Sequence, residues 1–230
     1  MSVIEVNGIT KDYGNHQGVF DVNFTVEKGE VLGFLGPNGA GKTTTIRQLM
    51  GFIKPDQGTV HIQGMDCFKN APEVQAQLGY LPGEIAFMDD MTGMDFIEFV
   101  ANMKNIQDMS KAKELIEFLE LNPKNKMKKM SKGMKQKIGL VIAFMQDAPI
   151  LILDEPGTGL DVLARERLLA TIKDLASAYD TTIIYVTHYP EEILASFDKT
   201  LLLRNGAVYK LGLTRELFTS EVMSDFFSYS

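Results

Sequence analysis

Apolar and polar residues alternate along the N-terminal part of the chain, and this period of two predicts β-strands. The alternating apolar positions are Ile4, Val6, Phe20, Val22, Phe24 and Val26. The apolar run at residues 31–35 predicts a buried strand. A turn signal at residues 55–58 precedes another alternating run at residues 59–62. Residues 3 to 80 are therefore expected to form mainly strands and turns.

Between about residues 85 and 148 the apolar positions take a helical spacing instead. Thr92 is a suitable N-cap for one helix, and Asn122 with Pro123 ends a second. The apolar positions are Phe96, Ile97, Phe99 and Val100 in the first helix, and Leu115, Ile116, Phe118 and Leu119 in the second. This segment predicts a helical lobe inserted into the chain.

Strands return at residues 150–153 and 183–186, with a helix expected from about residue 163 to 178 between them. A strand, a helix and a second strand in this order predict a βαβ unit with a parallel sheet. Asn205 and Gly206 separate two apolar runs and predict a hairpin. The last stretch, residues 217–227, has roughly helical spacing and predicts a closing helix.

These elements predict an α/β fold with a mixed sheet, an N-terminal antiparallel β subdomain and an inserted α-helical lobe. We expect one domain over residues 1–230. Its core lobe would comprise about residues 1–84 and 149–230, and its helical lobe about residues 85–148.

Composition narrows the class of protein. The chain has 230 residues, is 45% hydrophobic and 23% charged, and carries a formal net charge of −7, which argues against nucleic acid as a partner. No apolar run approaches the ~20 residues that cross a bilayer, and the N-terminus lacks the form of a signal peptide. The single cysteine, Cys67, cannot form an internal disulfide, which fits a reducing cytoplasm.

A glycine-rich segment between the buried strand and the next helical pattern carries the clearest chemistry. It matches the phosphate-binding loop G-x-x-x-x-G-K-[ST] of P-loop NTPases. Its candidate nucleotide-binding residues are Gly36, Asn38, Gly39, Ala40, Gly41, Lys42, Thr43 and Thr44. Lys42 can reach the β- and γ-phosphates, and the Thr43 hydroxyl can hold Mg²⁺. The alternative is a flexible turn, but the flanking strand and helix favour nucleoside triphosphate binding.

Two acids follow the apolar strand at residues 150–153. Ligands of open α/β sheets bind at the carboxyl ends of strands, so Asp154 and Glu155 are expected to face the phosphate loop. Asp154 is placed to hold Mg²⁺, and Glu155 to polarise the attacking water as general base. An acid pair ending a strand as part of an ordinary turn is the alternative.

The segment Ser131-Lys132-Gly133-Met134-Lys135-Gln136 lies upstream, with Ser131 placed 23 residues before Asp154. Ser131 can cap the following helix, whose free N–H groups can grip a terminal phosphate. At this position the chain resembles the ATP-binding subunits of ABC transporters, whose signature is commonly Leu-Ser-Gly-Gly-Gln. Ser131 and Gly133 keep that signature, whereas Met130, Lys132 and Met134 depart from it.

The resemblance implies roles for four further residues. His188 matches the switch histidine that contacts the γ-phosphate, and Asp161 matches the loop that crosses the dimer interface. Tyr13 matches the aromatic residue that stacks on adenine. A structural histidine and a half-buried tyrosine at a strand end are the alternatives. Gly83 stands where the family has a metal-contacting glutamine, so we expect either Glu84 or water to supply that oxygen.

The family resemblance further implies an ATPase that binds ATP and Mg²⁺ and pairs with a second copy of itself or a homologous ATP-binding subunit. It would drive a separate transmembrane permease, in the direction of export, from the cytoplasmic face of the membrane as a peripheral protein. Residues 85–91 are expected either to receive a helix of the permease or to pack in the helical lobe's own core. Two other functions remain open: a soluble ABC-type ATPase and a nucleotide-gated regulatory module.

Overall fold

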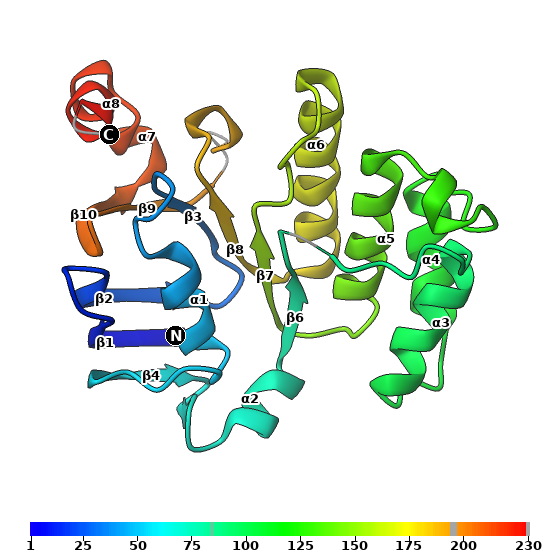
Figure 1. Ribbon diagram of the computed structural model, residues 1–230, viewed down its shortest axis with the longest axis horizontal. Coiled ribbons are helices and arrows are strands. Elements are labelled where there is room, and N and C mark those ends of the chain that lie inside the picture. The colour runs from blue at the N-terminus through cyan, green and yellow to red at the C-terminus, as the bar shows by residue number, and fades with distance from the viewer. Residues whose placement is uncertain (84, 194–196, 229–230) are drawn as a thin grey trace.

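The computed structural model describes residues 1–83, 85–193 and 197–228. A four-stranded antiparallel sheet has the order β2-β1-β4-β5. Its strands are β1 (Ser2–Asp12), β2 (Gly18–Glu27), β4 (Gln57–Ile62) and β5 (Met65–Asp66). Figure 1 shows β1, β2 and β4 side by side, with α1 (Lys42–Leu49) beside them.

A six-stranded sheet with the order β10-β9-β3-β8-β7-β6 forms the centre of the molecule. Its strands are β3 (Val31–Leu35), β6 (Leu78–Leu81), β7 (Ile150–Asp154), β8 (Thr182–Thr187), β9 (Lys199–Arg204) and β10 (Ala207–Leu213). Strands β9, β3, β8, β7 and β6 pair in parallel, and only β10 is antiparallel to its neighbour. The mixed sheet confirms the expected α/β fold class, and the β9–β10 pair confirms the hairpin at Asn205 and Gly206.

The central sheet separates two apolar cores. In β7, Ile150 and Ile152 join the core beneath the antiparallel sheet, whereas Leu151 and Leu153 join the core shared with the helices. Parallel strands that are covered on both faces show continuous apolar runs, which explains why these segments do not alternate with polar residues. The expected βαβ unit is present, because α6 (Val162–Tyr179) connects β7 to β8.

Three helices are inserted between β6 and β7, as Figure 1 shows. They are α3 (Gly93–Met103), α4 (Ser110–Phe118) and α5 (Lys132–Phe144), with a short 3₁₀ turn, η1 (Met127–Lys129), before α5. Thr92 caps α3 as expected, since its hydroxyl accepts from the Asp95 N–H at 3.1 Å and the Asp95 carboxylate accepts from the Thr92 N–H at 3.0 Å. This reciprocal capping box fixes where the helical lobe begins.

The remaining helices are shorter. Helix α2 (Ala71–Ala76) precedes β6, and a 3₁₀ turn, η2 (Pro190–Glu192), follows β8. The closing helix expected over residues 217–227 is present as α8 (Ser220–Phe227), which begins three residues later than expected, and a separate short helix, α7 (Thr214–Leu217), precedes it. The break has a clear cause, because Phe218 leaves the helical region with ψ 54° and the Thr219 hydroxyl then caps α8.

The alternating pattern of β2 fails at Phe20. Asp21 has a φ of 49°, so the strand bulges there, and the positions before the bulge that face inward move by one residue. Val19 is consequently buried in the core in place of Phe20, and Val22, Phe24 and Val26 follow as expected. No helix within the described residues combines the length and apolar character needed to span a membrane.

Candidate nucleotide-binding site

The phosphate-binding loop joins the carboxyl end of β3 to the first turn of α1. Its fold depends on close backbone contacts, because a Cβ at Gly36 would lie 2.5 Å from the Leu203 carbonyl oxygen. Gly41 has a φ of 102°, and a Cβ there would lie 2.5 Å from Val19 Cγ1. Both positions therefore require glycine, which turns the loop tightly before the helix N-terminus.

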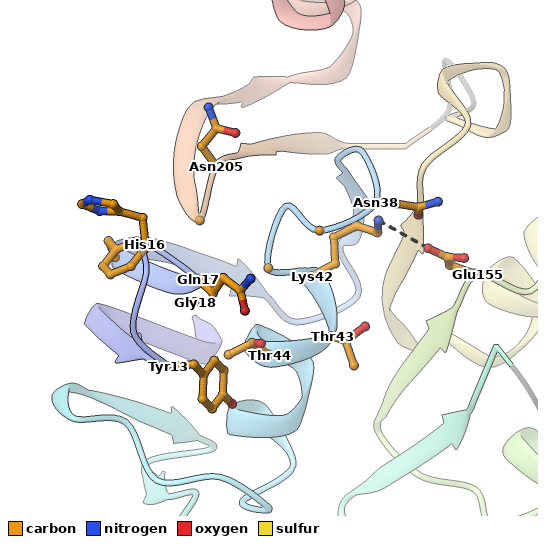
Figure 2. A pocket seen from close by; sticks show the side chains of 14 residues that line it. Tyr13, His16, Gln17, Gly18, Asn38, Lys42, Thr43, Thr44, Glu155 and Asn205 are labelled. Atoms are coloured by element: carbon orange, nitrogen blue, oxygen red, sulfur yellow. Dashed lines mark ion pairs between the residues drawn. The ribbon is translucent and has the colours of Figure 1, made fainter. Parts of the chain in front are cut away.

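Lys42 lies at the centre of this loop. Its Nζ donates to the carbonyl oxygens of Gly36 at 2.8 Å and Pro37 at 3.2 Å, and lies 3.3 Å from Glu155 Oε1. Figure 2 shows the lysine extending toward Glu155. Burial lowers the pKa of Lys42, and the Glu155 carboxylate opposes that shift. A phosphate entering the loop can therefore replace Glu155 as the partner of this buried ammonium group.

A cavity of about 880 Å³ opens beside the loop. Tyr13, Asn38, Thr43 and Thr44 line it, and the Tyr13 side chain is half exposed (Figure 2). An exposed aromatic ring at the rim of a phosphate-binding cavity has the geometry needed to stack on a base. The structure therefore brings Tyr13 and the phosphate-binding residues to one cavity.

Sequence reasoning missed several residues of this cavity. They are His16, Gln17, Gly18, Phe20, Asn205 and Gly206. The bulge in β2 turns Phe20 toward the cavity, and the β9–β10 hairpin approaches because Gly206 N–H donates to Ala40 O at 3.0 Å. The Asn205-Gly206 turn was visible in the sequence, but its position against the phosphate loop was not.

The two acids lie at the end of β7, beside the loop. Asp154 is buried, and the Tyr80 hydroxyl donates to its Oδ2 at 3.3 Å. Burial and the neighbouring Glu155 charge raise the pKa of Asp154. Glu155 has a φ of 48°, and its N–H bonds to Val186 O at 2.8 Å. This turn directs the Glu155 side chain toward Lys42.

Glu155 also contacts the end of β8. Its Oε1 lies 3.2 Å from His188 Nδ1, and its Oε2 accepts from the Thr158 hydroxyl at 3.3 Å. The carboxylate is thus held between Lys42, His188 and Thr158. The predicted general base and the predicted switch histidine are therefore direct neighbours in the structure.

A buried charge network lies behind His188. Glu192 accepts hydrogen bonds from the hydroxyls of Thr187 at 2.6 Å and Tyr185 at 3.1 Å, and it pairs with Arg165 Nε at 3.1 Å. The Arg165 guanidinium stacks 4.2 Å from the centre of the Tyr189 ring, which itself packs against His188. These contacts connect helix α6 to the segment that carries His188.

The candidate signature residues lie elsewhere. The Ser131 hydroxyl caps α5 by accepting from the Met134 N–H at 3.2 Å, and Asp161 caps α6 by accepting from the Ala164 N–H at 2.8 Å. Ser131 and Gly133 line a second cavity of about 370 Å³, and in the described part of the chain it shares no lining residue with the first. One chain therefore does not bring Ser131, Gly133 and Asp161 to its own phosphate loop.

The residues suited to Mg²⁺ are the Thr43 hydroxyl and the Asp154 carboxylate. Among the described residues no cluster of three or more His, Cys, Asp or Glu side chains could hold a metal ion by itself. Hard oxygen donors in this small number fit Mg²⁺, which takes the rest of its ligands from phosphates and water. A side chain at Gly83 would begin 3.1 Å from Asp154 O, but glycine supplies none. Glu84 lies outside the described residues.

A phosphate loop between a buried strand and a helix, with acids ending a neighbouring parallel strand, defines a P-loop NTPase. Within that class, the sequence profile of the ABC transporter family matches residues 19–158. The chain belongs to this family and is an ATP-binding ATPase subunit.

Two curated relatives agree with that assignment. The ABC transporter ATP-binding protein NatA of Bacillus subtilis is 32% identical over 91% of this chain and 87% of its own length. The bacitracin transport ATP-binding protein BcrA of Bacillus licheniformis is 34% identical over 89% of this chain and 68% of its own length. A solved structure of an ATP-binding subunit of an ABC transporter is 26% identical, covers 99% of this chain and 98% of its own, and superposes with a TM-score of 0.82.

Proposed function

We propose that two copies of this ATPase, or one copy and a homologous subunit, close around two ATP molecules and thereby drive a membrane permease. The observation that carries this proposal is the separation of the two cavities in one chain. The phosphate loop has Lys42 and Thr43 but lacks a second wall, and the capped end of α5 offers free N–H groups around Ser131 and Gly133. In a pair of chains each can complete the other's site.

The residues around Glu155 suit hydrolysis of the terminal phosphate. Lys42 neutralises the β- and γ-phosphates, and this releases Glu155 from its 3.3 Å contact with the lysine. Glu155 then takes the proton of the attacking water, while His188 orients that water against the γ-phosphate. Thr43 and Asp154 would hold Mg²⁺, which would supply neutralisation of the phosphate charge.

Glu155→Gln separates closure from hydrolysis. Removing the general base is expected to slow ATP hydrolysis by about 10²–10⁴-fold. Binding stays intact, because the amide keeps the shape of the carboxylate and no longer competes for Lys42. Light scattering of this variant should therefore show a dimer with ATP and a monomer without it. A variant that stays monomeric at saturating ATP would contradict the proposed closure.

An apolar cavity between β6, α2 and the helices α3 and α5 is the docking surface that we assign to the permease. The cavity measures about 290 Å³ and is lined in part by Phe52, Val100 and Ile142, with Lys104 among its polar residues. The Phe52 side chain at this cavity is 57% exposed, so a large apolar group there is available to a partner. These features fit a short amphipathic permease helix that places an acidic side chain against Lys104.

The segment at residues 85–91 is a weaker candidate for that surface. The Phe87 ring packs edge-on against Phe96 with 5.3 Å between centroids, and Phe96 is buried in the core that the helices share with the central sheet. The alternative interpretation, core packing, therefore suits Phe87 better. Phe87→Asp would damage the lobe itself, so substitutions at Phe52 give a cleaner test.

Purification from detergent-solubilised membranes of the native host tests the permease partner. The unmodified chain is expected to co-elute with a polytopic membrane protein, and Phe52→Asp is expected to lose it. Phe68→Asp is the matched control, because Phe68 is an exposed phenylalanine outside the docking cavity. Recovery only as a soluble dimer, or with ribosomal or other cytosolic partners, would favour a soluble ABC-type ATPase instead.

We place this subunit at the cytoplasmic face of the membrane, and we take export as the direction of transport. Support for export comes from the form of residues 131–136, together with Pro82, Gly83 and Glu84, which resembles that of bacterial exporter subunits. Host cells carrying Glu155→Gln should accumulate the cargo internally. Depletion of the affected compound from the cells would instead indicate import.

A further inference from the structure

Tyr80, on β6, lies between the Asp154 carboxylate and the docking cavity. Its hydroxyl donates to Asp154 Oδ2 at 3.3 Å, and Tyr80 lines the docking cavity together with Phe52 and Val100. The parallel register sets Tyr80 opposite Ile152, which is two residues before Asp154 on β7. One side chain thus contacts both the site of chemistry and the surface assigned to the permease.

The chemistry of this contact is that of an orienting hydrogen bond. The Tyr80 hydroxyl is the donor in this bond, because a carboxylate oxygen of Asp154 can only accept. The bond occupies one of the two carboxylate oxygens and restrains rotation of the buried Asp154 side chain. A residue that hydrogen-bonds to a metal-ligating carboxylate fixes the orientation of that carboxylate without contacting the metal itself.

We propose that Tyr80 is a positioning residue that holds Asp154 for nucleotide-bound Mg²⁺ and transmits filling of the docking cavity to that carboxylate. The second part of this proposal, the transmission half, is that Tyr80 transmits filling of the docking cavity to Asp154, and it rests on the proposed permease docking. Gly83 leaves room for such a role, because it supplies no side chain beside Asp154, where a Cβ would lie 3.1 Å from the Asp154 carbonyl oxygen. A helix pressing on the Tyr80 ring would shift its hydroxyl and, with it, Asp154.

The first part of the proposal, the positioning half, is that Tyr80 holds Asp154 for Mg²⁺. It is tested by measuring Mg²⁺ binding to the ADP complex in the absence of any permease. Tyr80→Phe removes only the hydroxyl and is expected to weaken Mg²⁺ binding to the ADP complex by roughly tenfold. Calorimetry, or Mn²⁺ resonance spectra, reports this affinity without turnover, and metal-free ADP binding should stay the same. Tyr179→Phe is the matched control, because the Tyr179 hydroxyl donates to another carboxylate, Glu114, at 2.7 Å. An unchanged Mg²⁺ affinity in Tyr80→Phe would overturn the assignment.

The transmission half is tested by filling the cavity chemically. Lys104→Cys places a thiol at the cavity wall, where N-phenylmaleimide adds an apolar ring. The native Cys67 does not interfere, since it is buried and its thiol pKa is raised to about 12. Labelling should change the Mg²⁺ affinity of the ADP complex when Tyr80 is present and leave it unchanged in Tyr80→Phe.

The same label on an exposed Lys28→Cys is expected to change nothing. Equal responses of Lys104→Cys with and without the Tyr80 hydroxyl would overturn the transmission. These measurements need no permease, so the two proposals can fail separately: a failed co-purification with normal Tyr80 effects would remove only the docking partner. Normal co-purification with no Tyr80 effect would remove only the role of Tyr80.

Discussion

At the scale of single residues, the site is organised by charge around Lys42. The lysine is 5% exposed and has Glu155 as its acidic partner at 3.3 Å, with His188 on the same carboxylate oxygen. The sequence alone indicated the phosphate loop and the acid pair, since both motifs are local. It could not indicate the Tyr80–Asp154 bond or the Arg165–Glu192 pair, because these residues are distant in sequence and belong to no short motif.

Because the pKa of Lys42 is lowered, ATP binding is expected to weaken at alkaline pH. Burial lowers this pKa below 10.5, and a bound phosphate raises it again. Binding should therefore take up a proton between the two pKa values, and ATP affinity should fall as pH rises through that window. Calorimetry in buffers of different ionisation enthalpy measures the uptake.

Glu155→Gln provides the internal comparison for that measurement. The Glu155 charge raises the pKa of Lys42, so its removal should move the window of proton uptake to lower pH. For the free protein, the lowered lysine pKa means that the free energy of unfolding rises as pH increases from the folded pKa toward 10.5. A window that stays in place in Glu155→Gln would show that another group takes up the proton.

At the scale of elements, the β9–β10 hairpin completes the nucleotide cavity. Its type I′ turn signal was plain in the sequence, and the structure places Asn205 and Gly206 at positive φ as that turn requires. What the sequence could not provide is the tertiary contact, in which Gly206 N–H donates to Ala40 O and Gly206 O accepts from the Phe20 N–H. The sequence did not predict the β2 bulge at Asp21 either. A single residue at positive φ shifts an alternating pattern by one position and leaves no strong signal in the sequence.

Gly206→Ala is expected to lower both stability and ATP affinity. Alanine at a φ of 76° costs about 1 kcal/mol in the backbone alone. Its Cβ would also lie 2.5 Å from Gly18 O, so the hairpin must move away from β2 and from the phosphate loop. Urea unfolding and ATP titration measure the two effects.

Gly64→Ala is the matched control for that substitution. Gly64 occupies a similar turn with a φ of 79°, but a Cβ there meets nothing within 4 Å. It should lose about 1 kcal/mol of stability and keep full ATP affinity. Equal ATP affinity in the two variants would contradict the role assigned to the hairpin.

At the scale of the whole molecule, the fold places the phosphate loop and the residues around Ser131 at two different cavities. The α/β fold class and the inserted helices follow from the periodicity of the sequence, because long apolar strands and amphipathic helices are strong signals. The distance between the phosphate loop and Ser131 is a tertiary property, and it became visible only as two cavities without a common lining residue among the described residues. The sequence could not predict the docking cavity either, because its lining residues Phe52, Val100 and Ile142 come from three separate segments.

Mixing two inactive variants tests the shared site most directly. Lys42→Ala removes the phosphate loop's cation but keeps the signature helix, whereas Gly133→Asp places a negative charge at the signature helix and keeps the loop. A mixed pair contains one site with an intact loop from one chain and an intact signature from the other. ATP hydrolysis should therefore reappear on mixing and be absent from each variant alone. A mixture as inactive as its separate components would contradict the two-chain site.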